Sequence, residues 1–68
     1  MKTQILDIIQ SFFLTSITYD DNFIELGGTS VMATLISNKI EEKFGLMVSP
    51  VYIIQCDTLE EFISVSLK

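Results

Sequence analysis

Residues 22–35 have the sequence Asn-Phe-Ile-Glu-Leu-Gly-Gly-Thr-Ser-Val-Met-Ala-Thr-Leu. Two adjacent glycines, Gly27 and Gly28, allow the backbone to turn tightly and let another molecule approach it closely. Ser30 follows where a helical pattern begins, so we expect it at or beside a helix N-terminus. The unpaired N–H groups of such an end favour an anionic substituent. The stretch therefore predicts an accessible hydroxyl at the positive end of a helix.

This helix is predicted over residues 30–44, because Gly45 is a favourable C-cap residue and Lys43 suits the last turn. At about 100° per residue, one face collects four apolar residues, with Met32 on its flank: Ala33, Ile36, Ile40 and Phe44. Val31 projects away from this face and Leu35 lies near its edge. We expect both to contact a partner protein, although single exposed apolar residues are also ordinary on protein surfaces.

A first helix is predicted over residues 3–14, with Thr3 as its N-cap and Asp7 in its first turn. Apolar residues recur there at helical spacing: Ile5, Leu6, Ile8, Ile9, Phe12 and Phe13. A strand over residues 12–14 is the alternative for its end. We expect this helix to join the core rather than lie on a membrane, because only Lys2 supplies positive charge.

Residues 15–29 are predicted to form a long connection, which in a small domain is usually functional. Several of its apolar residues should hold it against the helices: Ile17, Tyr19, Phe23, Ile24 and Leu26. The connection also contains four residues whose side-chain oxygens could bind calcium: Asp20, Asp21, Asn22 and Glu25. The loop signature fails, since its glycine would fall at Glu25 and its closing glutamate at Val31. We therefore expect no metal site, and turn and capping bonds from these short polar side chains.

The last third of the sequence predicts two more helices. Ser49 is a candidate N-cap with Pro50 at the first helical position, and a short helix follows over residues 51–55, although its β-branched residues also suit a strand. Thr58 and Glu61 have capping-box spacing, and the final helix has a buried stripe of Leu59, Phe62, Ile63 and Leu67. Cys56 is interpreted as a half-buried hydrophobic residue, with a reactive thiol as the alternative.

Composition excludes several kinds of function. The 68 residues are expected to form one domain, and the net charge of −5 makes nucleic acid a poor partner and basic proteins better ones. Without histidine, a Ser-His-Asp hydrolase cannot be built, and one cysteine without histidine does not suit zinc. No apolar run is long enough to span a membrane, and no signal peptide is recognisable. The single cysteine fits a reducing, cytoplasmic location.

The run from Asp20 to Ser30, Asp-Asp-Asn-Phe-Ile-Glu-Leu-Gly-Gly-Thr-Ser, followed by an apolar-rich helix, resembles the attachment motif of peptidyl carrier proteins. These thiolation domains belong to the acyl carrier protein superfamily. The Ser-Pro entry, short third helix and threonine-capped fourth helix are common in that family too, although Asp57 stands where it often has proline. The resemblance thus covers nearly the whole chain, and we expect residues 1–68 to form a single carrier domain. It implies an all-α, acyl-carrier-like bundle of four helices, the third one short, with a long loop between the first two.

By this resemblance, Ser30 carries a phosphopantetheine donated by coenzyme A, within a motif formed by Leu26, Gly27, Gly28 and Thr29. The thiol of that arm holds an aminoacyl or peptidyl group as a thioester, and the protein itself performs no catalysis. The implied partners are a phosphopantetheinyl transferase, an adenylating enzyme, and condensing, tailoring or releasing enzymes of a nonribosomal peptide pathway. We expect a monomer that contacts these enzymes through Val31, Met32, Leu35, Met47 and Tyr52.

The type of cargo is indicated by the residues around the serine. Fatty-acid carriers usually place an acidic residue immediately before it and have a strongly acidic second helix, whereas here Thr29 precedes it and Ser37-Asn38-Lys39 dilutes the charge. The Leu-Gly-Gly sequence also favours an aminoacyl or peptidyl cargo. Thr29 departs, however, from the histidine or aspartate common at this position in peptidyl carriers. A fatty-acyl or polyketide carrier is the first alternative, and a helical docking module without cargo is the second.

Overall fold

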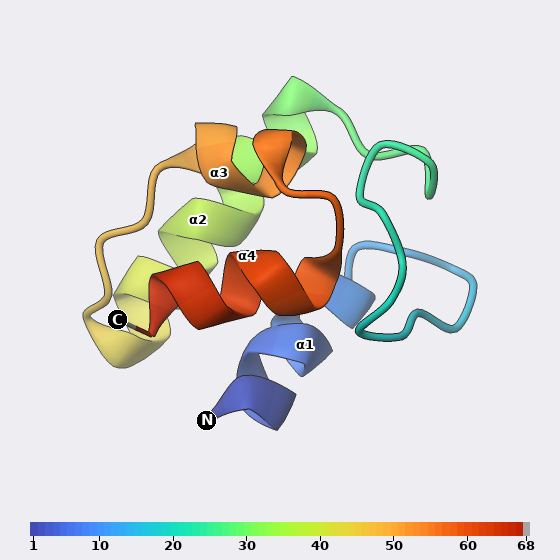
Figure 1. Cartoon of the computed structure of the whole chain (residues 1–68). Helices are drawn as coiled ribbons and strands as arrows, with labels where there is room; N and C mark the ends of the chain where they lie inside the picture. The colour runs from blue at the N-terminus through green and yellow to red at the C-terminus, as the bar shows by residue number, and fades with distance from the viewer. Residues whose placement is uncertain (68) are drawn as a thin grey trace.

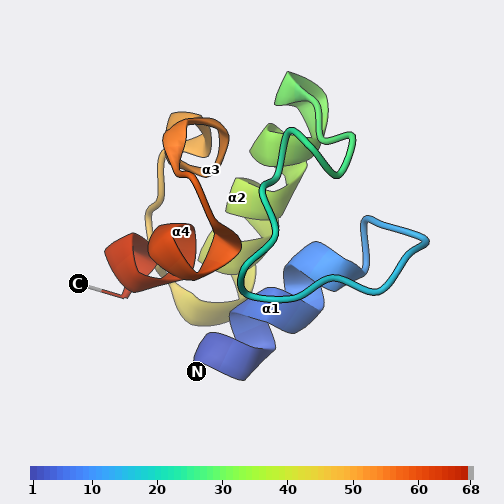
Figure 2. The same cartoon turned by 45° about the vertical axis from the view of Figure 1, so that its right-hand side comes forward.

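The computed structural model describes residues 1–67, which contain four helices and no strand. These are α1 (Lys2–Gln10), α2 (Ser30–Phe44), α3 (Pro50–Gln55) and α4 (Leu59–Ser66). α1 and α3 each contact both α2 and α4, so the helices surround one common core (Figures 1 and 2). The connection between α1 and α2 forms a long excursion on one side of the bundle. The predicted all-α fold with a long first loop and a short third helix is confirmed.

The core consists almost entirely of the apolar residues that the periodicities place on inward faces. Those buried on the four helices are Ile5, Ile8, Ile9, Ala33, Ile36, Ile40, Ile53, Leu59, Phe62 and Ile63. Ile17 and Phe23 add two buried side chains from the loop, and Phe12, Phe13, Met32, Phe44 and Leu67 pack half-buried around the core. The strand alternative for residues 51–55 is wrong, because Ser49 caps α3, Pro50 begins it and Ile53 is buried as part of a helix.

The first helix departs from its prediction at both ends. It begins at Lys2, so Thr3 lies inside it and caps nothing, and Asp7 lies beyond the first turn. It ends at Gln10 rather than Leu14, because the Gln10 side chain offers the following chain alternative hydrogen bonds. Its Nε2 donates to the Thr15 carbonyl at 2.7 Å, and its Oε1 accepts from the Ile17 N–H at 2.9 Å. The residues beyond Gln10 form a turn, and the strand alternative for this end is also wrong.

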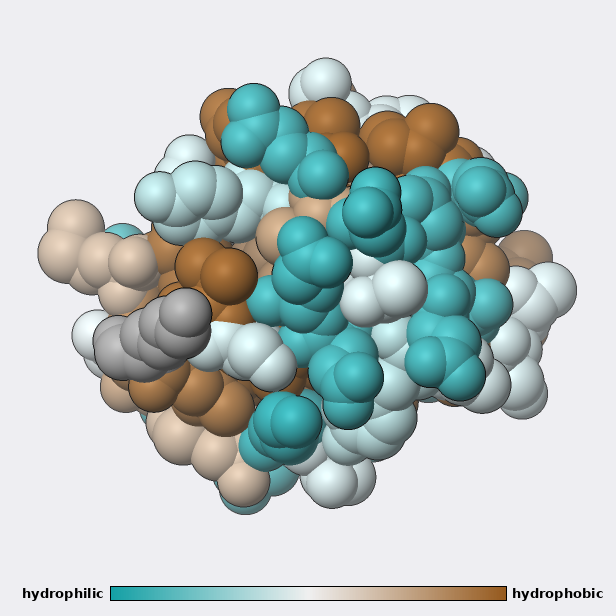
Figure 3. Space-filling model, viewed as in Figure 1, coloured by the Kyte–Doolittle hydropathy of each residue, from teal (hydrophilic) through white to brown (hydrophobic). Residues whose placement is uncertain are grey.

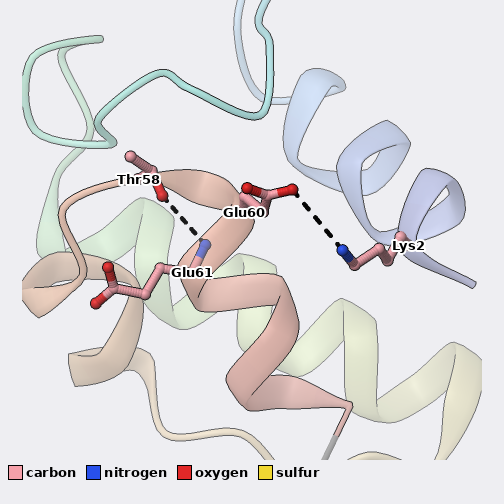
Figure 4. Close-up of polar contacts among 4 residues, drawn as sticks. All are labelled: Lys2, Thr58, Glu60 and Glu61. Atoms are coloured by element: carbon pink, nitrogen blue, oxygen red, sulfur yellow. Dashed lines mark hydrogen bonds and ion pairs between the residues drawn. The ribbon is translucent and has the colours of Figure 1, made fainter.

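The remaining helix ends follow their local sequence. Gly45 ends α2 in the left-handed conformation (φ 70°), which suits a residue without a Cβ atom. The Thr58 hydroxyl accepts from the Glu61 N–H at 3.2 Å and caps α4 (Figure 4). Within residues 1–67, the Glu61 carboxylate makes no hydrogen bond back to Thr58, so only half of the predicted capping box forms. A buried Ser37 hydroxyl, which the pattern did not single out, donates to the Val48 carbonyl at 2.7 Å and joins α2 to the next connection.

No helix within residues 1–67 combines the length and the apolar character that crossing a lipid bilayer requires.

The two threonines at the beginnings of α1 and α4 provide a matched test of capping. We expect Thr58→Ala to lower the free energy of unfolding by about 1 kcal/mol, because an orphan N–H of α4 loses its acceptor. Thr3→Ala should change it by less than about 0.5 kcal/mol, because Thr3 lies within the first turn of α1, its side chain caps nothing, and alanine is a good helix former. Urea unfolding followed by circular dichroism measures both. Equal losses in the two variants would contradict the observed start of α1.

Candidate functional site

The segment before α2 is a compact turn built on backbone hydrogen bonds. The Leu26 N–H donates to the Asn22 carbonyl at 3.0 Å, the Gly27 N–H to Ile24 at 2.9 Å, and the Gly28 N–H to Phe23 at 3.0 Å. Successive bonds of this kind fix the course of the chain over one full turn. The turn therefore fixes the direction in which the backbone enters α2.

The beginning of α4 holds this loop in place. The first N–H groups of a helix have no partners within it, and here those of Leu59 and Glu60 donate to the carbonyls of Asp21 and Tyr19 at 2.9 and 3.0 Å. The Asn22 side chain adds two bonds, donating from Nδ2 to the Asp57 carbonyl and accepting the Glu25 N–H at Oδ1, both at 3.0 Å. These long-range contacts bring the loop and α4 together.

Two of the four polar side chains expected to make turn and capping bonds, those of Asp21 and Asn22, do so. Asp21 Oδ2 accepts the Thr18 N–H at 2.8 Å, and Asn22 makes the two bonds described above. Within residues 1–67, no group of three or more His, Cys, Asp or Glu side chains is arranged to hold a metal ion. These bonds confirm the turn interpretation for Asp21 and Asn22.

The two glycines of the motif serve different purposes. Gly27 has a φ of 93°, a conformation that residues with a Cβ atom rarely adopt. Gly28 is required by close packing, since a Cβ atom built on it would lie 2.5 Å from ring atoms of Phe23. Phe23 is only 1% exposed and meets Phe13 edge to face, with ring centroids 5.9 Å apart. We expected both glycines to let another molecule approach the backbone. The structure leaves Gly27 open to such an approach, but Phe23 covers one side of Gly28.

Ser30 is the first residue of α2, and its side chain is exposed. Thr29, not Ser30, is the N-cap: its Oγ1 accepts the Met32 N–H at 3.2 Å. Within residues 1–67, the Ser30 hydroxyl makes no hydrogen bond, and neither do the N–H groups of Ser30 and Val31. The helix end thus presents a hydroxyl not engaged in capping beside two unpaired donors, which is the environment that favours a negatively charged substituent.

Apolar side chains lie exposed around this helix end. Val31 is 69% exposed, and Leu35 on α2 and Tyr52 on α3 are also exposed, while Met32 is half-buried against the core. Figure 3 shows apolar residues gathered along the upper edge of the molecule, where Figure 1 places α3 and the first turns of α2. Met47 is 88% exposed but follows the opposite end of α2, so the structure does not bring it together with Val31.

Two further apolar residues of this surface were not predicted. Ile24 and Val51 are exposed large hydrophobic residues. Ile24 was expected among the residues that hold the loop against the helices, but it lies exposed in the turn, where helical periodicity gives no indication of which side chains face outward. Val51 lies in the first turn of a helix so short that its β-branched residues were equally consistent with a strand.

Cys56 lies half-buried at the end of α3, as its interpretation as a small hydrophobic residue requires. Partial burial, followed by the negative charges of Glu61 and Asp57, raises the pKa of its thiol above the ordinary value of 9.0. A raised pKa keeps the thiol protonated near neutral pH and makes it a poor nucleophile. This environment does not favour the alternative of a reactive cysteine.

Taken together, these features define a small helical domain with an exposed serine at the start of α2, the longest helix among residues 1–67. A model of one family, described as the phosphopantetheine attachment site, matches residues 3–65. The chain therefore belongs to this family, whose domains hold phosphopantetheine covalently on a serine and act as carriers, generally not as catalysts. Such domains interact with a phosphopantetheinyl transferase and with enzymes that use the arm. Searches of the curated proteins and of the solved structures found no match.

The contact between Phe23 and Gly28 predicts a specific pattern of stability changes. Gly28→Ala should lower the free energy of unfolding by about 1–3 kcal/mol, because the added methyl group overpacks the Phe23 ring. In the double variant with Phe23→Leu, the two losses should be less than additive by at least about 0.5 kcal/mol. Urea unfolding measures all members of this cycle.

Gly27→Ala is the matched control. It should also destabilise the fold, by about 1–2 kcal/mol, because its conformation is unfavourable for alanine. Nothing lies within 4 Å of a Cβ atom at this position, so Phe23→Leu should not relieve the loss. Full additivity at Gly28, or relief at Gly27, would contradict the assignment of different roles to the two glycines.

Proposed function

We propose that Ser30 is the serine that carries phosphopantetheine, and that residues 1–68 form one carrier domain. The supporting observation is the division of roles at the start of α2, where Thr29 caps the helix and leaves the exposed Ser30 hydroxyl without a hydrogen bond among residues 1–67. The unpaired N–H groups of Ser30 and Val31 favour the phosphodiester that attachment creates. When bound, the group supplies a thiol on a flexible arm, which holds an acyl group as a thioester.

The other serines lack this combination of features. Three of them donate their hydroxyls to backbone carbonyls, Ser11 to Ile8, Ser37 to Val48 and Ser66 to Phe62. Ser49 is itself a cap, accepting from the Val51 N–H. Ser16 lies in the loop and Ser64 inside α4, away from any helix N-terminus. Ser30 is therefore the best candidate for attachment.

We propose an aminoacyl or peptidyl cargo, delivered within a nonribosomal peptide pathway. A polar, uncharged Thr29 precedes Ser30, and the first turn of α2 carries no acidic residue. The Leu26-Gly27-Gly28 sequence supports the same choice through its resemblance to peptidyl carriers. The loading partner is then an adenylating enzyme, followed by condensing, tailoring or releasing enzymes, and the single cysteine fits the cytoplasm.

The surface around Ser30 is our proposed contact for these enzymes. Val31 and Leu35 extend from α2 and Tyr52 from α3, and all three are exposed. An exposed apolar patch next to an attachment point buries favourable area when an enzyme closes over it. Met32 contributes only its outer edge, and Met47 belongs to a separate part of the surface.

Intact-mass measurement after incubation with coenzyme A and a broad-specificity phosphopantetheinyl transferase tests the attachment site. We expect one phosphopantetheine addition to the wild type and none to Ser30→Ala. The substitution should leave the fold intact, because the Ser30 hydroxyl makes no hydrogen bond within residues 1–67. Circular dichroism checks this.

Ser16→Ala is the matched control, because Ser16 is an exposed serine in the connection that precedes α2, and its replacement should leave the addition unchanged. Retained addition on folded Ser30→Ala would move the site to another serine. No addition to folded wild-type protein with several transferases would favour the docking module without cargo.

Loading assays on the phosphopantetheinylated protein test the cargo. We expect amino-acid adenylating enzymes to load it and malonyl-transferring enzymes to leave it unloaded, as measured by the mass of the acylated protein. Val31→Asp should lower kcat/KM for loading about tenfold or more, because it places a charge in the proposed contact. Exclusive acceptance of malonyl groups would contradict the peptide pathway and favour a fatty-acyl or polyketide carrier.

A further inference from the structure

A groove between α1 and α2 lies away from Ser30. It encloses about 470 Å³ and is lined by Gln4, Asp7, Ile8 and Ser11 on one side and by Lys39, Lys43 and Phe44 on the other. Its first residue on α2 comes nine positions after Ser30, which corresponds to about 13 Å along the helix axis. The groove therefore does not include the attachment end of α2.

The charges of this groove differ from those of the molecule as a whole. The chain has a net charge of −5, yet two of the three lysines in residues 1–67 line the groove. Lys2 pairs with Glu60 at 3.8 Å (Figure 4), whereas Lys39 and Lys43 form no ion pair within the described part of the chain. At a spacing of four residues on one helix, their ammonium groups project from the same side. Two neighbouring cations are thus available for carboxylates.

Many of the acidic residues lie on other elements. Three are in the loop and three at the start of α4, which the loop contacts directly: Asp20, Asp21, Glu25, Asp57, Glu60 and Glu61. Asp7 is the acidic residue on the α1 wall of the groove. At physiological ionic strength, charges separated by more than about 8 Å are largely screened. Glu41 and Glu42 lie on α2 between the two lysines in the sequence, but neither is among the residues that line the groove. The charged residues of the groove lining are therefore Lys39, Lys43 and Asp7.

Apolar surface accompanies the two lysines. Ile8 and the half-buried Phe44 line the groove itself. A segment that combines carboxylates with a large apolar side chain complements this lining, whereas two cations are too few for a nucleic acid backbone.

We propose that the groove between α1 and α2 docks an acidic amphipathic segment of a partner protein. Its carboxylates pair with Lys39 and Lys43, and an apolar side chain covers Ile8 and Phe44. Carboxylates four residues apart on a helix match the spacing of the two lysines. Because the groove lies away from Ser30, a partner bound here leaves the start of α2 open to a second enzyme, a consequence that rests on the proposed attachment at Ser30.

Three short synthetic peptides probe the groove by NMR titration of the ¹⁵N-labelled full chain in about 0.15 M salt. Each presents a leucine face flanked by paired residues four apart, which are Glu in the first peptide, Gln in the second and Lys in the third. We expect the Glu peptide to shift the amide signals of α1 and of the second half of α2, with an affinity about fivefold higher than that of the Gln peptide. The Lys peptide should bind more weakly still.

The variant Lys39→Gln/Lys43→Gln should weaken binding of the Glu peptide about fivefold, because both charge partners are removed. Lys2→Glu lowers the net charge by the same two units but lies outside the groove lining, so it should change the affinity by less than about twofold. Asp7→Asn should strengthen binding, since it removes the like charge on the opposite wall.

The proposal is overturned by any of four results: no shifts at about 1 mM Glu peptide, equal affinity for the Gln peptide, shifts confined to α3 and α4, or unchanged binding to Lys39→Gln/Lys43→Gln. Ser30→Ala should bind the Glu peptide as the wild type does. The peptide titration tests the groove and the phosphopantetheine addition tests attachment at Ser30, so a negative result in one experiment does not decide the other.

Discussion

The packing of Phe23 is the interaction on which the arrangement of this domain depends. Its ring is almost completely buried, meets Phe13 edge to face beyond the end of α1, and occupies the space beside Gly28 where another residue would place a Cβ atom. One side chain thus joins the first helix, the loop and the backbone that leads into α2. Since Gly28 is two residues before Ser30, the core determines where the hydroxyl at the helix end is presented.

A carrier domain must hold one reactive position firmly on a small surface that several enzymes recognise in turn. Here the start of α2, where we propose the attachment, is stabilised from two directions, by the core beneath Phe23 and by the N-terminal N–H groups of α4, which donate to carbonyls of the loop. The first N–H groups of α4 have no partners within that helix and would otherwise need water. By donating to the loop that leads into α2, they are satisfied and also hold this loop in place. The family's chemistry belongs to the attached arm, so a small helical domain can act as a carrier.

The distribution of charge divides the surface into regions of different character. Hydrophilic residues gather over the start of α4 and the adjoining loop, and apolar residues border the first turns of α2 and α3 (Figure 3). Two lysines line the groove between α1 and α2. A protein handled by successive enzymes gains from such separation, because partners of different charge are directed to different faces. The net charge of −5 alone would indicate only basic partners.

Signals that act within a few residues were sufficient to predict much of this structure. Periodicity and capping predicted the bounds of α2 with its Gly45 end, the Ser49-Pro50 start of α3, the Thr58 cap and most core residues. They also predicted a serine at a helix N-terminus. Contacts between distant residues decided the rest. Gln10 ends α1 by bonding to the chain five and seven residues later, Asn22 reaches the Asp57 carbonyl, and Phe23 explains Gly28. Local patterns determine which helices form, because the hydrogen bonds and caps of a helix join residues close together in the sequence. Only tertiary packing sets the course of the loop and the presentation of Ser30, because the contacts that fix them join residues far apart in the sequence.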